Sequence, residues 1–313
     1  MFIPKYWKHI AKTVDGIDMT KCKRHWNRGN EAYISSWGYS NASEDDALRK
    51  AHERFAETVE ALQNPQDNNL YYPHAVIKED IIEIIEDKKG KAIITRNRYG
   101  ALVLNTEQLM FIDIDTPEMI KGEPGFLQKL FGKKFVWKRL STEGKRVFED
   151  GKMKEVESFC HAHPEFGCKV YKTFAGLRLI ATHKSYAADS EETQKIFDAL
   201  GCDPLYQKLC QSQKCFRARL TPKRWRMTEG EVLNKPELTF RITKEMIEDW
   251  QPSDEKRLKQ YEQWTQVYDQ SAKNYATCQF VQLLGNANID AELKDLIELH
   301  DRYTNANEEK TLA

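Results

Sequence analysis

Two aspartates two residues apart are the part of this 313-residue sequence best suited to chemistry. Asp113 and Asp115 end an apolar run, Leu109–Ile114, that predicts a buried strand. Side chains two apart in a strand point to the same face, so the two carboxylates stand side by side. Like charges this close are costly unless a cation neutralises them, and Mg²⁺ or Mn²⁺ suits a site made of oxygens. The alternative is a strand end, where the acids cap a solvated turn at Thr116 and Pro117.

A second candidate is the turn between two predicted strands over residues 168–173 and 177–182. Thr173, Gly176 and Arg178 lie close together around this turn. Backbone N–H groups at a tight turn, together with a guanidinium, form a cradle for phosphate. The alternative is an ordinary hairpin with an exposed arginine.

A third candidate is the stretch 204–228, which holds seven basic residues and no acidic one. Arg217 and Arg219 alternate with apolar residues, so they share one face of a predicted strand. The loop that follows carries three more basic residues, Lys223, Arg224 and Arg226. Such a run, with aromatic residues between the charges, fits contacts with phosphates and bases. A solvated edge strand is the alternative.

Composition restricts the remaining readings. The 48 basic and 48 acidic residues cancel, so only the local distribution of charge points to a polyanionic partner. No apolar run approaches 18 residues, which predicts no membrane span. Seven scattered cysteines and no secretory leader predict reduced thiols in a cytoplasmic protein. One group has some resemblance to zinc ligands, namely Cys160, His161, His163 and Cys168, but without paired Cys-x₂-Cys knuckles, buried thiols are the better reading.

Periodicity and turn signals predict an α+β protein with antiparallel strands. The predicted helices span about 43–62, 78–86, 145–161, 190–200, 254–268, 274–284 and 291–303. The predicted strands before the hairpin span 91–96, 101–105 and 109–115. We expect an α+β domain over residues 1–250, with a basic loop near 118–146, and a helical C-terminal appendage over 251–313 that is a candidate surface for a protein partner.

The order of these motifs resembles the archaeo-eukaryotic primase superfamily, the fold of primase–polymerases. Asp113 and Asp115 match its Asp-x-Asp strand, and Asp203 is the best match for its third carboxylate. The hairpin matches the family's second motif in shape, but Arg178 stands where the family has a histidine. The resemblance covers about residues 90–240.

The basic strand and loop also resemble this family, through Arg217, Arg219 and Lys223. The resemblance implies a primase-type catalytic core with a mostly antiparallel sheet flanked by helices. It also implies two Mg²⁺ or Mn²⁺ ions that align a primer hydroxyl with the α-phosphate of a nucleotide. The implied metal ligands are Asp113, Asp115 and Asp203. The implied triphosphate contacts are Arg178, Arg217, Arg219 and Lys223.

Three functions remain open on this basis. The first is a metal-dependent nucleotidyltransferase of primase or polymerase type, acting on nucleic acid with nucleoside triphosphates. The second is a module that kept the fold, lost polymerisation and binds single-stranded nucleic acid, which the Arg178 replacement favours. The third is a metal-dependent nuclease, since two-carboxylate sites serve both synthesis and cleavage.

Overall fold

The computed structural model describes residues 1–15, 27–28, 31–63, 76–87, 90–122, 136–227, 236, 238, 240–248 and 250–313. Within these ranges the protein is a mixed α+β structure, and every strand pair but one short parallel pair runs antiparallel. The predicted α+β class with antiparallel strands is therefore confirmed.

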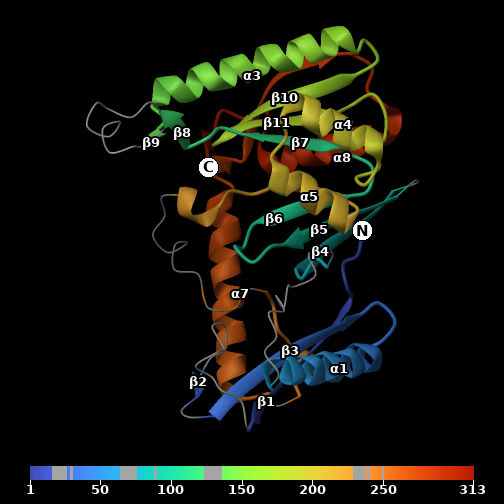
Figure 1. Ribbon diagram of the computed structural model, residues 1–313, viewed down its shortest axis with the longest axis vertical. Coiled ribbons are helices and arrows are strands. Elements are labelled where there is room, and N and C mark those ends of the chain that lie inside the picture. Colours follow the sequence, from blue (N-terminus) through green and yellow to red (C-terminus); the bar gives the residue numbers. More distant parts are fainter. Residues whose placement is uncertain are drawn as a thin grey trace.

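One four-stranded sheet, at the top of Figure 1, positions the two aspartates. Its order is β14 (Cys278–Gly285), β10 (Gly167–Thr173), β11 (Gly176–Ala181) and β7 (Phe111–Asp115). β10 and β11 form the predicted hairpin, and β7 pairs with β11 at the edge of the sheet. The two aspartates therefore lie on an edge strand, with the other side of that strand free to meet a second layer.

A second four-stranded sheet supplies the basic strand. Its order is β12 (Phe216–Arg219), β6 (Leu102–Thr106), β5 (Gly90–Arg96) and β4 (Asp80–Asp87). The helix predicted over 78–86 is wrong, because this segment is β4 and pairs with β5. Its two pairs of isoleucines fit either period, and β-branched residues favour a strand once a pairing partner is present. β12 contacts β7, so the edges of the two sheets meet at a seam.

Four helices cover the sheets: α3 (Thr142–Ala162), α4 (Glu191–Leu200), α5 (Pro204–Gln213) and α8 (Ala291–Thr304). α8 covers the face of the upper sheet that carries Phe111 and Tyr171, since the His300 ring of α8 contacts both side chains. α3 lies along the outside of the same sheet (Figure 1) and packs against β14. One continuous apolar core joins these elements.

The C-terminal part of the chain contributes a strand and a helix to this same body. The predicted helices 254–268 and 291–303 are confirmed as α7 (Pro252–Ala272) and α8. The helix predicted over 274–284 is wrong, because these residues form β13 (Tyr275–Ala276) and β14. The open edge of β10 supplies hydrogen-bonding partners that local sequence does not reveal. β13 pairs with β15 (Thr311–Leu312), which is the only parallel strand pair among the described residues.

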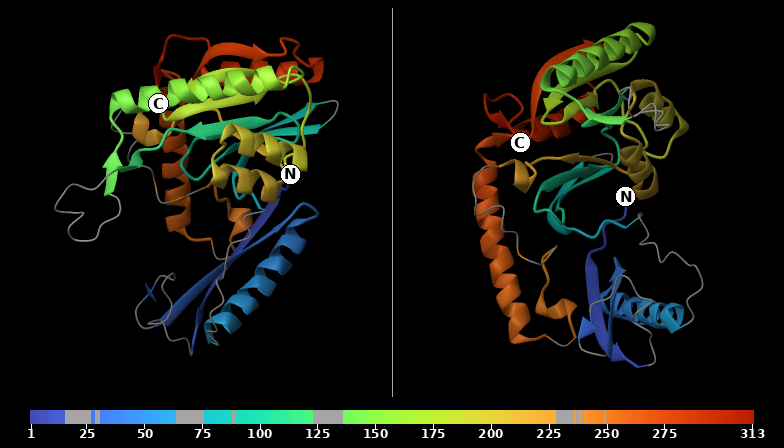
Figure 2. Two further views of the ribbon diagram at one scale, coloured as in Figure 1. Left: turned by 45° about the horizontal axis from the view of Figure 1, so that its top comes forward. Right: turned by 60° about the vertical axis from the view of Figure 1, so that its left-hand side comes forward.

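The N-terminal part forms a separate layer at the bottom of Figure 1. It consists of β1 (Tyr6–Val14), β2 (Asn27–Arg28), β3 (Glu31–Ser40) and α1 (Glu44–Gln63). α1 confirms the helix predicted over 43–62 and packs on both long strands. As Figure 2 shows, α7 runs from this layer to the upper body. The short helix η3 (Lys244–Met246) also contacts β1.

Two smaller features flank the seam. The strands β8 (Met119–Gly122) and β9 (Val136–Arg139) pair at the base of the predicted basic loop. Residues 123–135 of that loop lie outside the described residues. The short helix η2 (Arg224–Arg226) follows β12 and carries the basic residues predicted for its loop.

Candidate functional site

The two aspartates of β7 have different neighbours across the strand pair. Asp113 lies opposite Arg178, whereas Asp115 lies opposite Gly176. The residues between and before them are buried, while Asp113 is half-buried and Asp115 is exposed. One carboxylate therefore faces a long cationic side chain, and the other faces a position with no side chain.

Gly176 is required by the close approach of β11 to β7. Its φ is 145°, and an added Cβ would lie 2.0 Å from the carbonyl oxygen of Ile114. No other residue fits there without moving β7. Thr173 also serves the turn, since its hydroxyl donates to the Gly176 carbonyl at 3.1 Å and accepts from the Ala175 N–H at 3.3 Å. Thr173 and Gly176, two of the three residues predicted to cradle phosphate, thus shape the turn of the hairpin.

Arg178 is buried, so the alternative of an exposed arginine on an ordinary hairpin is wrong. Only 2% of its side chain is exposed. Its Nε donates to Asp113 Oδ1 at 2.9 Å, and its Nη1 donates to the Arg219 carbonyl at 3.0 Å. Burial alone would lower the pKa of this guanidinium, but the charge of Asp113 raises the pKa above its ordinary value. Arg178 therefore stays charged and links β7 to β12 across the seam.

Asp203 lies beside the β7 carboxylates because α5 docks on that strand. The Asp203 backbone N–H donates to the Asp113 carbonyl at 2.9 Å. Its side chain caps α5 by accepting from the Tyr206 N–H at 2.7 Å. Burial, and then the charges of Asp113 and Asp203, raise the pKa of Asp115. The structure thus gathers the three aspartates that the sequence pointed to, and their charges repel one another.

The two arginines of β12 have different surroundings. Arg217 donates from Nη2 to Glu79 Oε2 at 2.6 Å, and most of both side chains is buried. Both arginines have a buried Nε without a hydrogen-bond partner among the described residues, but Arg219 also lacks an ion pair there. Burial and the charges of Arg178 and Arg226 lower the pKa of Arg219 to about 10. Arg217 is thus neutralised by the protein itself, and Arg219 is not.

The η2 loop adds further positive charge beside the aspartates. Burial and the nearby Arg219 and Arg226 lower the pKa of Lys223, and the charges of Asp115 and Asp113 partly oppose this shift. Lys223 is therefore close enough to both the arginines and the carboxylates to be affected by their charges. The guanidinium of Arg224 is 5.9 Å from the ring of Trp225.

Exposed aromatic rings border this basic cluster. The Tyr99 and Trp225 rings lie edge to face with centroids 5.3 Å apart, and 36% and 48% of these residues is exposed. The Arg226 guanidinium sits 4.2 Å from the ring of Phe174, which is 53% exposed. Sequence analysis did not select Tyr99 or Phe174. Both residues lie in turns between strands, where a large aromatic ring has no core to enter. This position was the signal in the sequence that could have identified them as exposed rings.

Within the described residues, no group of three or more His, Cys, Asp or Glu is arranged to hold a metal ion. Among the aspartates, Arg178 contacts both oxygens of Asp113, and the Tyr206 N–H donates to one oxygen of Asp203. Asp115 accepts no hydrogen bond from any described residue. The three carboxylates are thus adjacent but do not form a preformed metal cage.

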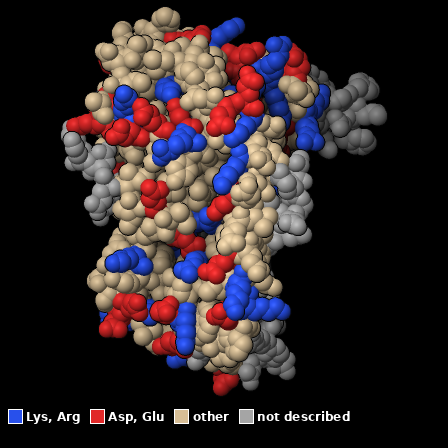
Figure 3. Space-filling view, turned by 180° about the vertical axis from the view of Figure 1, so that it is seen from behind, with Lys and Arg blue, Asp and Glu red and all other residues tan. Residues whose placement is uncertain are grey.

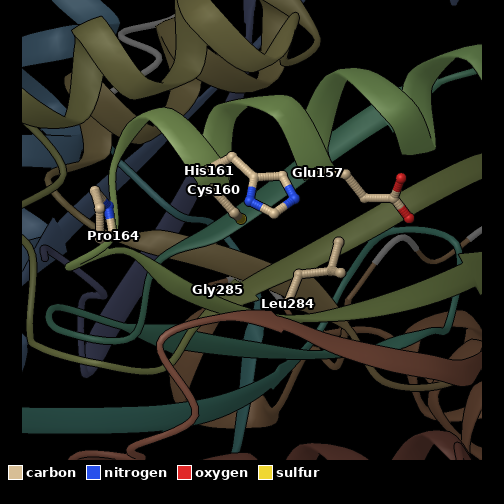
Figure 4. Close-up of a pocket in the computed structure, with 6 residues that line it drawn as sticks. All are labelled: Glu157, Cys160, His161, Pro164, Leu284 and Gly285. Atoms are coloured by element: carbon tan, nitrogen blue, oxygen red, sulfur yellow. The ribbon is translucent and has the colours of Figure 1, made fainter.

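The suggested zinc group does not assemble either. Cys160 and Cys168 are buried with their thiols in contact, while His161 and His163 are exposed. A cavity of about 370 Å³ lies beside α3. Figure 4 shows the residues that line it, which are Glu157, Cys160, His161, Pro164, Leu284 and Gly285. Six cysteines lie in the described residues, and all six are buried free thiols.

Two wider observations complete the site. The rear face of the molecule mixes acidic and basic side chains, as Figure 3 shows, so the concentration of positive charge around β12 and η2 is a local feature. Among the helices in the described ranges, none has the length and apolarity needed to cross a membrane. Comparison with protein-family models, with curated proteins and with solved structures gives no match.

Proposed function

We propose that the protein is a nucleotidyltransferase of primase or polymerase type that joins nucleotides from nucleoside triphosphates on nucleic acid. One observation carries this proposal. Asp113 and Asp115 lie two residues apart on β7, the Asp203 N–H donates to the Asp113 carbonyl, and the nearby Arg219 has no ion pair with any described residue. The negative charges of the aspartates and the positive charge of Arg219 are incompletely compensated within the protein. Such a site favours a ligand that carries both phosphate and a metal cation.

The donor set supports a single divalent cation completed by substrate. Asp115 accepts no hydrogen bond from the part of the chain that the structure describes, and the helix cap at Asp203 uses one of its two oxygens. Mg²⁺ is commonly held by one or two carboxylates together with substrate phosphates and water, so a preformed cage of protein ligands is not required. We infer that Asp115 and Asp203 hold Mg²⁺ or Mn²⁺. When bound, the ion would polarise the α-phosphate and stabilise the negative charge that develops there.

The basic residues have separate parts in this proposal. Arg219 and Lys223 face the carboxylates and would hold the triphosphate, with Arg226 adding charge from the loop. Arg217 is a weaker candidate, since Glu79 already neutralises it. Two parallel N–H groups of Arg219 match phosphate oxygens, so its interaction would orient the triphosphate as well as attract it.

The aromatic border supports a single-stranded partner. Tyr99, Phe174 and Trp225 present exposed rings beside Arg224 and Arg226. Bases stack on such rings with little sequence preference, and the cations track the phosphate backbone. We therefore place the template strand along the η2 loop and the two turns.

A primer-extension assay tests the proposed function. Wild-type protein with a primer–template, nucleoside triphosphates and Mn²⁺ should extend the primer, and Asp115→Asn should lower the rate at least a hundredfold. Asp198→Asn, on the exposed face of α4, is the matched control and should extend at the wild-type rate. Shortening of the labelled strand by wild type alone would select the nuclease, and equal extension by wild type and Asp115→Asn would refute the proposed site.

The ion pair between Arg178 and Asp113 favours a second candidate, a module that binds single strands without turnover. Salt-dependent binding of single-stranded DNA that persists in Asp115→Asn, with no extension by any variant, would select it. The cytoplasmic location and a protein partner at the C-terminal helices stay predictions. The free thiols agree with the first. For the second, α7 and α8 both bury apolar residues in the body of the protein, so the candidate surface for a partner is the exposed face of these helices.

A further inference from the structure

We propose that Arg178 is a permanent internal countercharge for Asp113, which withdraws Asp113 from metal binding and leaves Asp115 and Asp203 as the acidic ligands. The inference rests on the proposed function in one respect, that these carboxylates bind a divalent cation. It departs from the sequence expectation in two respects. Asp113 is not a metal ligand, and Arg178 is not a phosphate contact.

The contacts of Arg178 show that it is built into the protein. Its Nε and Nη2 lie 2.9 Å and 3.5 Å from the two oxygens of Asp113. Its Nη1 donates to the Arg219 carbonyl at 3.0 Å and lies 3.5 Å from Nε2 of His300. The guanidinium therefore meets protein groups on every side. An arginine that is 2% exposed and already surrounded in this way has little left to offer a phosphate.

His300 contacts the Nη1 atom of the Arg178 guanidinium. Its ring is completely buried and packs against Phe111 and Tyr171. Its Nδ1 lies 3.1 Å from Asp301 Oδ1, which also accepts from the Tyr171 hydroxyl at 2.6 Å. A proton on Nδ1 that is donated to Asp301 leaves Nε2 as an acceptor facing Arg178.

Asp301 in turn is paired with Lys169. The result is a buried polar chain from α8 through the sheet to Asp113, with each charge compensated inside the protein. His300 is a positioning residue in this chain, since it contacts Arg178 and none of the carboxylates of the site.

The register makes the assignment specific to Asp113. Arg178 lies directly opposite Asp113, and the next pair along the strands, Gly176 and Asp115, has no cation. A monovalent guanidinium fixed on one carboxylate does part of what a second metal ion would do, and it does so without depending on the metal concentration. The two aspartates of one motif thus have separate roles: Asp113 holds Arg178, and Asp115 is left for an exchangeable cation.

Mn²⁺ binding, measured by electron paramagnetic resonance on the full chain, tests this division without any assay of activity. Asp115→Asn should raise the Kd for Mn²⁺ at least tenfold, whereas Asp113→Asn should change it less than twofold. Arg178→Gln, which frees Asp113, should lower the Kd at least tenfold, and Arg178→Gln with Asp113→Asn should reverse that gain. His300→Leu should lower the Kd severalfold, because Arg178 is less firmly held.

A gain in metal affinity cannot arise from damage to the fold, which would weaken binding. If Arg178→Gln fails to fold, the comparison of Asp113→Asn with Asp115→Asn still shows which of the two aspartates binds the metal ion. Equal weakening by these two variants, or a folded Arg178→Gln that binds Mn²⁺ as wild type does, would overturn the inference. If the wild type extends primers, the proposed function is retained even when one of these two results overturns the inference. Tighter Mn²⁺ binding by Arg178→Gln without any extension by wild type would refute the proposed function alone.

Discussion

The two ends of β12 differ sharply although they carry the same residue on the same face. At one end Arg217 is held by Glu79 at 2.6 Å, and Glu79 also accepts from the Thr95 hydroxyl at 2.5 Å. At the other end Arg219 has no ion pair with any described residue, and burial and neighbouring cations lower its pKa. Both arginines have a buried Nε without a hydrogen-bond partner among the described residues, so the difference between them is the carboxylate of Glu79, which compensates the charge of Arg217 alone.

This difference separates a structural ion pair from a binding site. A compensated pair in the protein interior resists loss of either partner, because the remaining charge is left desolvated. An uncompensated cation beside acidic residues is unfavourable in the free protein and becomes favourable when a ligand neutralises it. Arg217 should therefore govern stability, and Arg219 should govern binding.

The largest expected effect is on stability at the Arg217 end. Arg217→Met leaves Glu79 buried without its cation and should lower the free energy of unfolding by about 3 kcal/mol. Urea denaturation followed by circular dichroism measures this loss. Nucleotide affinity of the folded fraction should stay at the wild-type value.

A double variant provides the control for that prediction. Glu79→Gln combined with Arg217→Met removes both charges and should recover more than half of the lost stability. A double variant no more stable than Arg217→Met would show that packing of the arginine stem, and not its charge, is what matters there.

The matched change at the other end should affect binding instead. Arg219→Met should weaken the affinity for a nucleoside triphosphate with an uncleavable α–β bond by about ten- to a hundredfold, the value of one or two hydrogen bonds between charged groups. Isothermal titration calorimetry with Mn²⁺ present measures it. The Tm should stay level or rise, because a poorly compensated charge is removed. A fall in Tm like that of Arg217→Met would erase the distinction between the two ends.

The aromatic border gives an intermediate effect. Trp225→Ala should weaken binding of a short single-stranded oligonucleotide about fivefold to fiftyfold, as expected for loss of one stacked base. Fluorescence anisotropy measures the affinity. Ile289→Ala, which removes an exposed apolar side chain before α8, is the control and should bind as wild type does. Equal affinities for Trp225→Ala and wild type would remove this ring from the proposed strand path.

The smallest effect is a pH-dependent gain in stability. The pKa of Asp115 is raised in the folded protein by burial and by Asp113 and Asp203. Protonated Asp115 therefore contributes to the stability of the folded state. This contribution is fully present below the unfolded pKa of about 3.9 and is lost as the pH rises through the higher folded pKa. Asp115→Asn should thus raise the Tm by about 1–3 °C at pH 7 and leave it unchanged near pH 3.5. A difference in Tm that is the same at both pH values would contradict this assignment.

Sequence patterns predicted much of this fold where local signals were strong. The hairpin of β10 and β11, the Asp-Ile-Asp strand and the capped helices α1 and α4 lie where periodicity and turn residues placed them. The predicted helices at 78–86 and 274–284 are strands: the first pairs with the next strand, β5, in a hairpin, and the second pairs with β10, which lies about a hundred residues earlier. Local propensity carries no information about a partner that lies many residues away.

For the site, the sequence predicted which residue types take part, and the fold determined which partners they contact. The period of a strand places Asp113 and Asp115 on one face, and Arg217 and Arg219 on another, whatever the rest of the chain does. Cross-strand register then put Arg178 against Asp113 and Gly176 against Asp115, and the second sheet brought Glu79 to Arg217 alone. Charge compensation depends on contacts between segments far apart in sequence, so only the tertiary structure decided which of these like residues are satisfied and which are left open.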